Sequence, residues 1–142
     1  MKIGYLGVGN PSRDVAFEVD FDFPNNTQRI ETFTNMKVTK QASYTTHKIH
    51  ARKAVPEMTG LEADQITFNI LLSAYLGVNP KKELDKLEDF MKNGNILNLV
   101  LGDQLFGRWV LKSMPYNVEY VYKEGDITQA KCTITLLEAG DD

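Results

Sequence analysis

The feature that most constrains the fold is a long alternation of apolar and polar side chains over residues 127–137. Apolar residues occupy its even positions, which are Ala130, Cys132, Ile134 and Leu136. Polar residues occupy the odd positions between them. A period of two residues is that of a β-strand with one buried and one solvated face. The segment therefore predicts a half-buried strand, and a fold built around a sheet.

Similar patterns elsewhere predict more strands. Residues 17–23 and 66–72 alternate in the same way, and residues 96–101, 107–112 and 118–122 also predict strands. Residues 28–52 are rich in Thr and Lys and predict two extended strands that are polar on both faces. Pro56 and Gly60 predict a loop over residues 55–60. Gly125, between Glu124 and Asp126, predicts a tight hairpin turn.

One segment has the periodicity and end signals of a helix. Asn79 can cap its start, Pro80 suits the first turn, and Gly94 is placed to end it. An apolar stripe at helical spacing lies between them, formed by Leu84, Leu87, Phe90 and Met91. The expected fold is mainly β (α+β), an antiparallel sandwich or barrel with one central helix over about residues 80–93. We expect one domain over residues 1–142, with a polar extended arm at about residues 25–53.

The distribution of charge is more informative than the net charge of −3. Residues 28–53 carry six basic groups and one acid, Glu31, so this segment is +5 and the remainder is −8. A basic arm on an acidic body can complement a second copy of the chain. We therefore expect interface residues in both blocks. They are Lys37, Lys40, Lys48, Arg52 and Lys53 in the arm, and Glu18, Asp20 and Asp22 on the acidic strand.

Composition excludes several classes of protein. The acidic balance argues against a general or sequence-specific nucleic-acid binder. No apolar run approaches the ~20 residues of a membrane span, and no secretory signal is visible. The single cysteine, Cys132, cannot form a bridge within the chain, which favours synthesis in a reducing cytoplasm.

No motif predicts a catalytic, cofactor or metal site. The glycine-rich residues 4–9 lack the dinucleotide-binding order and read as a flexible entry to the first strand. His47 and His50 are three apart on a predicted strand, so they point to opposite faces and cannot chelate one metal. Cys132 lies in the apolar phase of its strand, as a small hydrophobic residue. Two other classes stay open: a β-barrel that binds a small ligand, and an enzyme using Glu18, Asp20 and Asp22.

Residue order from about Tyr44 to Glu138 resembles the tail protein U family of contractile-tailed phages. The most specific element is Leu76-Gly77-Val78-Asn79-Pro80 before a charged helix. Further matching segments are His47, residues 56–61, residues 64–68, Gly94, residues 99–102, Gly107-Arg108-Trp109-Val110, Gly125 and residues 136–138. Within this match we expect structural roles for Gly77, Asn79, Pro80, Gly94, Gly107 and Trp109.

The resemblance implies a non-enzymatic structural protein with a tail-tube-like β fold. It implies a ring, six-fold in symmetry, around the axis of a phage tail or of a headless, bacteriocin-like particle. The implied position is near the baseplate, as in the ripcord of R-type pyocin-like particles, and the implied partners are the tail tube, the baseplate hub, a LysM-like protein and the sheath initiator. The alternative position is a ring that completes the head-proximal end of the tube. Assembly in the bacterial cytoplasm, without cofactor or membrane, follows from this role.

Overall fold

The computed structural model describes residues 2–10, 13–22, 27–47, 55–102 and 104–139. Its strands are β1 (Lys2–Gly7), β2 (Val15–Asp22), β3 (Thr27–Glu31), β4 (Phe33–Thr39), β5 (Ala42–His47), β6 (Val55–Leu61), β7 (Gln65–Ser73), β8 (Leu97–Leu101), β9 (Gln104–Ser113), β10 (Tyr116–Val121) and β11 (Ile127–Glu138). Its helices are the short turns η1 (Ala74–Leu76) and η2 (Lys123–Gly125) and the α-helix α1 (Pro80–Asn93). The expected mainly β fold with one central helix is confirmed.

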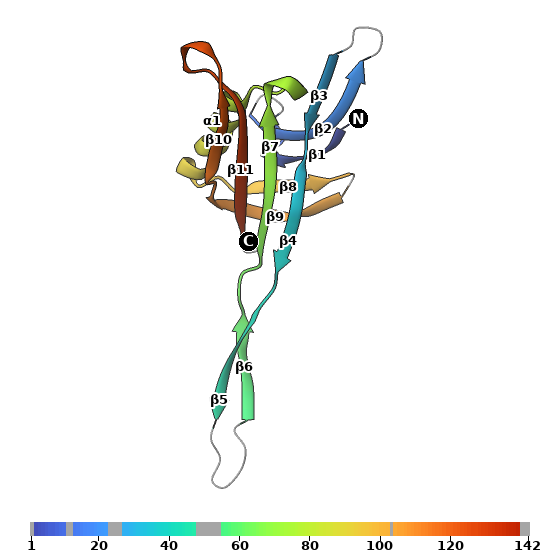
Figure 1. Cartoon of the computed structure of the whole chain (residues 1–142). Helices are drawn as coiled ribbons and strands as arrows, with labels where there is room; N and C mark the ends of the chain where they lie inside the picture. The colour runs from blue at the N-terminus through green and yellow to red at the C-terminus, as the bar shows by residue number, and fades with distance from the viewer. Residues whose placement is uncertain (1, 11–12, 23–26, 48–54, 103, 140–142) are drawn as a thin grey trace.

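Nine strands form one antiparallel sheet, in the order β3-β2-β1-β8-β9-β11-β7-β4, with β10 paired to β11. The sheet is not a closed barrel, because β3 and β4 are its two ends. It folds over on itself, so that β8 and β9 cross behind β7 and β11 (Figure 1). β5 and β6 form a separate two-stranded sheet, a hairpin that projects away from this body (Figure 1).

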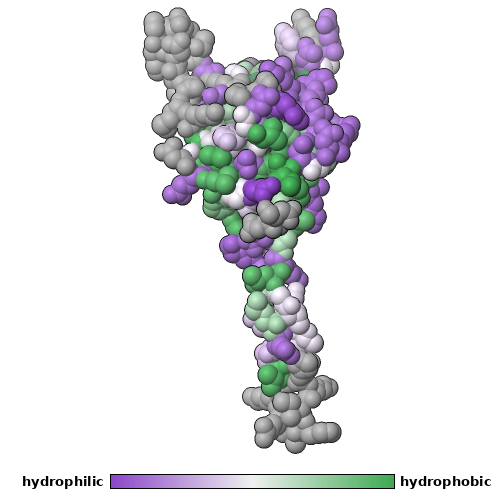
Figure 2. Space-filling model, turned by 180° about the vertical axis from the view of Figure 1, so that it is seen from behind, coloured by the Kyte–Doolittle hydropathy of each residue, from purple (hydrophilic) through white to green (hydrophobic). Residues whose placement is uncertain are grey.

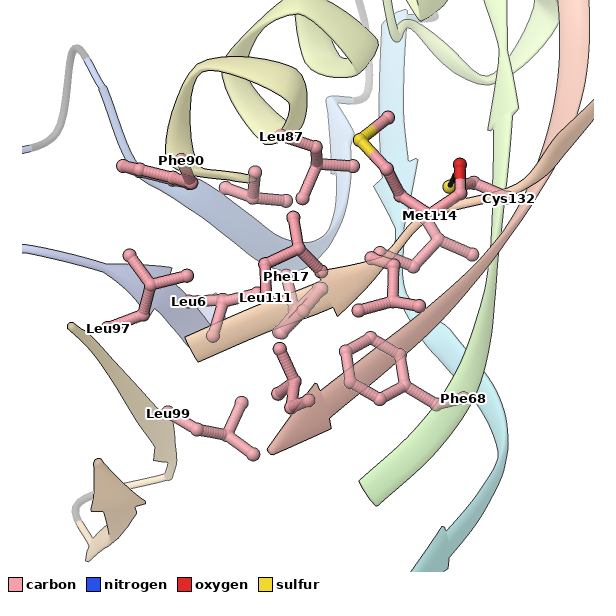
Figure 3. Packing of buried hydrophobic residues seen from close by; sticks show 14 of the residues in the cluster. Leu6, Phe17, Phe68, Leu87, Phe90, Leu97, Leu99, Leu111, Met114 and Cys132 are labelled. Atoms are coloured by element: carbon pink, nitrogen blue, oxygen red, sulfur yellow. Dashed lines mark hydrogen bonds between the residues drawn. The ribbon is translucent and has the colours of Figure 1, made fainter. Parts of the chain in front are cut away.

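The core fills the space between the crossing layers and α1 (Figure 3). Strand β11 contributes the residues predicted from its alternation, Ala130, Cys132, Ile134 and Leu136, all fully buried. Leu87 and Phe90 bring the apolar stripe of α1 onto the same cluster. The exposed residues of α1 carry the ion pair Glu88–Lys92, at 2.8 Å. Burial by alternation on strands and at helical spacing on α1 therefore gives one continuous core.

The glycine-rich N-terminal segment is not a flexible entry, as its composition suggested, but the central strand β1. It pairs with β2 on one side and β8 on the other. A side chain at Gly4 would collide with the backbone of β8, since a Cβ there would lie 1.9 Å from the carbonyl oxygen of Val100. The glycine permits this close approach of two strands, and its role is in packing rather than in flexibility.

Residues 27–61 also differ from the sequence prediction, because they form four strands rather than two strands and a loop. β3 and β4 belong to the main sheet. Phe33 packs edge-on against Phe17 and Phe68, with ring centroids 5.3 and 6.0 Å away, and each such pair is worth ~0.5–1.5 kcal/mol. The expected loop over residues 55–60 is strand β6, in which Pro56 lies opposite Thr46 and Gly60 opposite Ser43.

Candidate assembly interface

The β5–β6 hairpin has one apolar and one polar face. Its register places Tyr44 opposite Met58, Ala42 opposite Leu61, and Thr46 opposite Pro56. Directly opposed residues share a face, so these pairs lie together on what we call the apolar hairpin face, defined as residues 42, 44, 46, 56, 58 and 61. Thr45 and Glu57 are opposed on the other face.

Among the residues that the structure describes, none covers the apolar hairpin face. Leu61 is 80% exposed, Tyr44 60% and Met58 51%. Figure 2 shows hydrophobic residues along the described part of the projection. An isolated two-stranded ribbon is marginally stable in water, since stability normally needs a third strand or packing against another element. The hairpin therefore exposes apolar side chains that the described part of the chain does not bury.

Polar contacts fix the root of the hairpin to the body. Lys40 Nζ lies 2.7 Å from Asp64 Oδ2, and the charge and hydrogen bond of Asp64 raise the pKa of Lys40 above its ordinary value. Ser43 Oγ donates to Glu62 Oε1 at 3.1 Å, and the amide of Asp64 donates to Glu138 Oε1 at 3.4 Å. These contacts connect the two strands leaving the body to each other and to β11.

Of the basic residues expected at an interface, the structure describes two, Lys37 and Lys40. Lys37 is exposed on β4, at an edge of the main sheet. Lys40 lies at the hairpin root and is engaged by Asp64. Lys48, Arg52 and Lys53 fall outside the described residues, as does His50. The structure therefore leaves Lys37 exposed and gives Lys40 an intramolecular ion pair.

The acidic residues expected at an interface follow one another along β2. Their backbone partners lie on β3, with Glu18 opposite Glu31, Asp20 opposite Arg29, and Asp22 opposite Thr27. Glu18 is half-buried. The β2–β3 pair and the β5–β6 hairpin extend from opposite ends of the body (Figure 1). Among the described residues, no group of three His, Cys, Asp or Glu side chains could hold a metal ion.

The residues expected to be structural lie at turns and in the core. Asn79 Oδ1 accepts a hydrogen bond from the amide of Lys82, and Pro80 begins α1. Gly77 and Gly94 have left-handed backbones, at φ 80° and 62°, that end η1 and α1. Gly107, at φ 107°, lies against the indole of Trp109, which is buried and donates from Nε1 to the carbonyl oxygen of Phe106 at 3.1 Å.

The apolar hairpin face was missed by sequence reasoning. Its signal is the alternation of Ala42, Tyr44 and Thr46, but threonines and lysines around it made the segment look uniformly polar. Pro56 and Gly60 predicted a loop where the structure has the second strand, β6.

In the described part of the chain, no helix is long and apolar enough to cross a membrane.

Comparisons with known proteins give a matching family and matching solved structures. The family model described as Phage P2 GpU matches residues 20–141. Among solved structures, the tail of an empty GTA particle with C6 symmetry matches 97% of this chain and 92% of that chain, at 8% identity and a TM-score of 0.49. A search of curated protein sequences gives no match.

Proposed function

Since this chain belongs to the Phage P2 GpU family and is a structural component of a phage tail or tail-like particle, we propose that it forms a ring around the tail axis near the baseplate. The proposed ring links the tail tube to the baseplate hub and the sheath initiator, with a LysM-like protein beside it. The role requires no catalytic step, and the protein is assembled in the bacterial cytoplasm and leaves it as part of the particle.

The observation that carries the proposal is the β5–β6 hairpin with its uncovered apolar face. A ring needs contacts that each subunit makes in the same direction to its neighbour, because such heterologous contacts close when the rotation per subunit is right. A projection on one side of the body supplies a contact of this kind. The exposed Tyr44, Met58 and Leu61 give it the apolar area that specific association requires.

The position near the baseplate is supported by the resemblance of residues 44–138 to tail protein U. The charge partition fits the same role. Lys37 and the lysines and arginine of residues 48–53 oppose an acidic remainder, and such charges act chiefly on encounter and register. They are therefore expected to matter collectively rather than as single pairs.

A pair of neighbouring substitutions tests the proposal. Tyr44→Lys places a charge on the apolar hairpin face, whereas Thr45→Lys places the same charge on the opposite face, across from Glu57. Both side chains are exposed, so neither change should alter stability by more than ~0.5 kcal/mol. Each variant is produced with the other tail genes, and sheathed particles are counted by electron microscopy.

We expect Tyr44→Lys to abolish or strongly reduce particle formation and Thr45→Lys to leave it near normal. Thermal unfolding of both purified variants controls for misfolding. Normal particle numbers with Tyr44→Lys would contradict an assembly role for the hairpin. Equal loss with both variants would show that the apolar face has no special part in assembly.

A further inference from the structure

A second surface of the chain is also left uncovered, and it lies on strand β10. All six residues of β10 are exposed, and they include Tyr116, Val118, Tyr120 and Val121. Tyr122, directly after the strand, is 62% exposed. In the described part of the chain β10 is paired on one side only, with β11. An aromatic strand with a free edge is a template for pairing with another strand.

The edge strand β4 shows what a protected edge looks like in the same molecule. Its pairing with β7 is interrupted between Thr34 and Lys37, where Asn35 has a left-handed backbone at φ 56°. The exposed Lys37 places a charge beside this bulge. A bulge and a lysine are devices that prevent edges from pairing with other chains. β10 also has register shifts on either side of Tyr120 and carries Glu119, but over Tyr116–Val121 it has no lysine or proline, and its outer edge is unpaired in the described part of the chain.

We propose that the β5–β6 hairpin of one copy pairs with the free edge of strand β10 of the next copy and extends its sheet, so that the apolar hairpin face continues the exposed apolar side chains of β10. The inference rests on the proposed function and names the surfaces that join the subunits. Both surfaces are apolar, both are formed by strands of similar length, and neither is covered by the residues that the structure describes. The hairpin and the β10–β11 pair lie at opposite ends of the molecule, which makes the contact head-to-tail (Figure 1).

The available area is consistent with a specific contact. Tyr44, Tyr116, Tyr120 and Tyr122 are each 47–62% exposed. At roughly 200 Å² per aromatic side chain, these four expose on the order of 500 Å². A specific interface needs about 1,000 Å² in total, counted over both partners. Met58, Leu61, Val118 and Val121, together with the backbone of the paired edges, provide the remaining area.

The buried cysteine makes a clean cross-linking experiment possible. Burial raises the pKa of the Cys132 thiol to about 11, so it stays protonated and unreactive near neutral pH. One tagged copy carries Met58→Cys and a second, differently tagged copy carries Tyr120→Cys. Both are expressed with the other tail genes, and purified particles are treated with a short bis-maleimide. The matched control replaces Tyr120→Cys by Leu105→Cys, which is on β9 and equally exposed, at 60% against 61%.

We expect a product carrying both tags with Met58→Cys and Tyr120→Cys, at least several-fold above the Leu105→Cys control. Particles that contain both copies without this product would overturn the docking but leave the ring intact as a proposal. Cross-linking of Met58→Cys chiefly to another tail protein would also overturn the docking and leave the ring as a proposal. Wild-type chain absent from purified tails would instead overturn the proposed function and the docking with it.

A second measurement does not depend on the cysteine variants. Tyr120→Lys should reduce sheathed particles as strongly as Tyr44→Lys, whereas Leu105→Lys should have little effect. All three substitutions lie at exposed positions, so the folded monomers should melt alike. Equal particle numbers for Tyr120→Lys and wild type would contradict the docking.

Discussion

The connection between β1 and β2 depends on one buried carboxylate, and removing it should weaken the whole domain. Asp14 is 5% exposed, and its side chain accepts hydrogen bonds from the amides of Val8 at 2.7 Å and Gly9 at 2.9 Å. Hydrogen bonds to charged groups contribute ~1.5–3 kcal/mol each. Val8 and Gly9 are themselves exposed, so water can replace part of what Asp14→Ala removes. We therefore expect Asp14→Ala to lower the free energy of unfolding by about 2–3 kcal/mol.

Denaturant titration of the purified chain measures this change, and Asp14→Asn is the matched control. Asparagine keeps one acceptor oxygen and should cost about half as much, roughly 1–1.5 kcal/mol. Gly7→Ala provides an independent check, because a Cβ there would lie 2.0 Å from Asp14 Oδ1 and 2.2 Å from its Cγ. Its cost should fall in the Asp14→Ala background. A loss below ~0.5 kcal/mol for Asp14→Ala would be that of an ordinary surface change and would show that the carboxylate does not stabilise the domain. Strict additivity of Asp14→Ala and Gly7→Ala would show that the two positions do not interact.

Three further predictions concern the body. Trp109→Ala should cost ~3–5 kcal/mol or prevent folding, and unchanged melting would contradict the buried position of the indole. Gly94→Val should lower the free energy of unfolding by about 1 kcal/mol or more, and Gly94→Asn by less, because asparagine tolerates the left-handed backbone better. No atom lies within 4 Å of a Cβ at this position, so equal effects of the two substitutions would exclude backbone strain as the cause. Since a pKa of about 11 instead of 9.0 leaves a hundredfold less thiolate, Cys132 should react with a thiol reagent at pH 8 only after unfolding; rapid labelling of the folded chain would show that it is accessible.

The helix and the regular strands could be predicted because their signals are local. Asn79, Pro80 and Gly94 act on backbone groups within a turn of themselves, so their roles follow from residue type and order. The alternation of β11 is equally local, since the polarity of each residue indicates which face of the strand it lies on. The core residues on these elements were therefore readable in advance.

Strands β1 and β6 could not be predicted because they form through pairing with β8 and β5, which the local sequence does not indicate. Gly4 is in a strand because the backbone of Val100 passes beside it, and the sequence around Gly4 contains no trace of that contact. Pro56 and Gly60 interrupt the local pattern, yet pairing with β5 outweighs both. Tertiary context overrode propensity at each of these positions.

The expected interface residues remain a prediction, and the structure adds an exposed apolar face on β5 and β6, of which β5 lies within residues 28–53. The prediction rested on the charge of residues 28–53. In the structure, Lys40 is paired with Asp64, and the exposed side chains of the hairpin include the apolar Tyr44, Met58 and Leu61. The opposition of Tyr44 and Met58 depends on the register of two strands, including the irregularity between Ser43 and Tyr44. Register across a hairpin cannot be read from one strand alone.

This chain is a structural component of a phage tail or tail-like particle, and we propose that the particle is not completed without it. The most direct measurement is the number of sheathed particles produced when its gene is removed from an otherwise complete set of tail genes, with the full chain restored in parallel. We expect sheathed particles to disappear without the chain and to return with it, and the restored chain to be present in the purified particles at a fixed copy number. Normal numbers of complete particles in the absence of the chain would show that tail assembly does not need it.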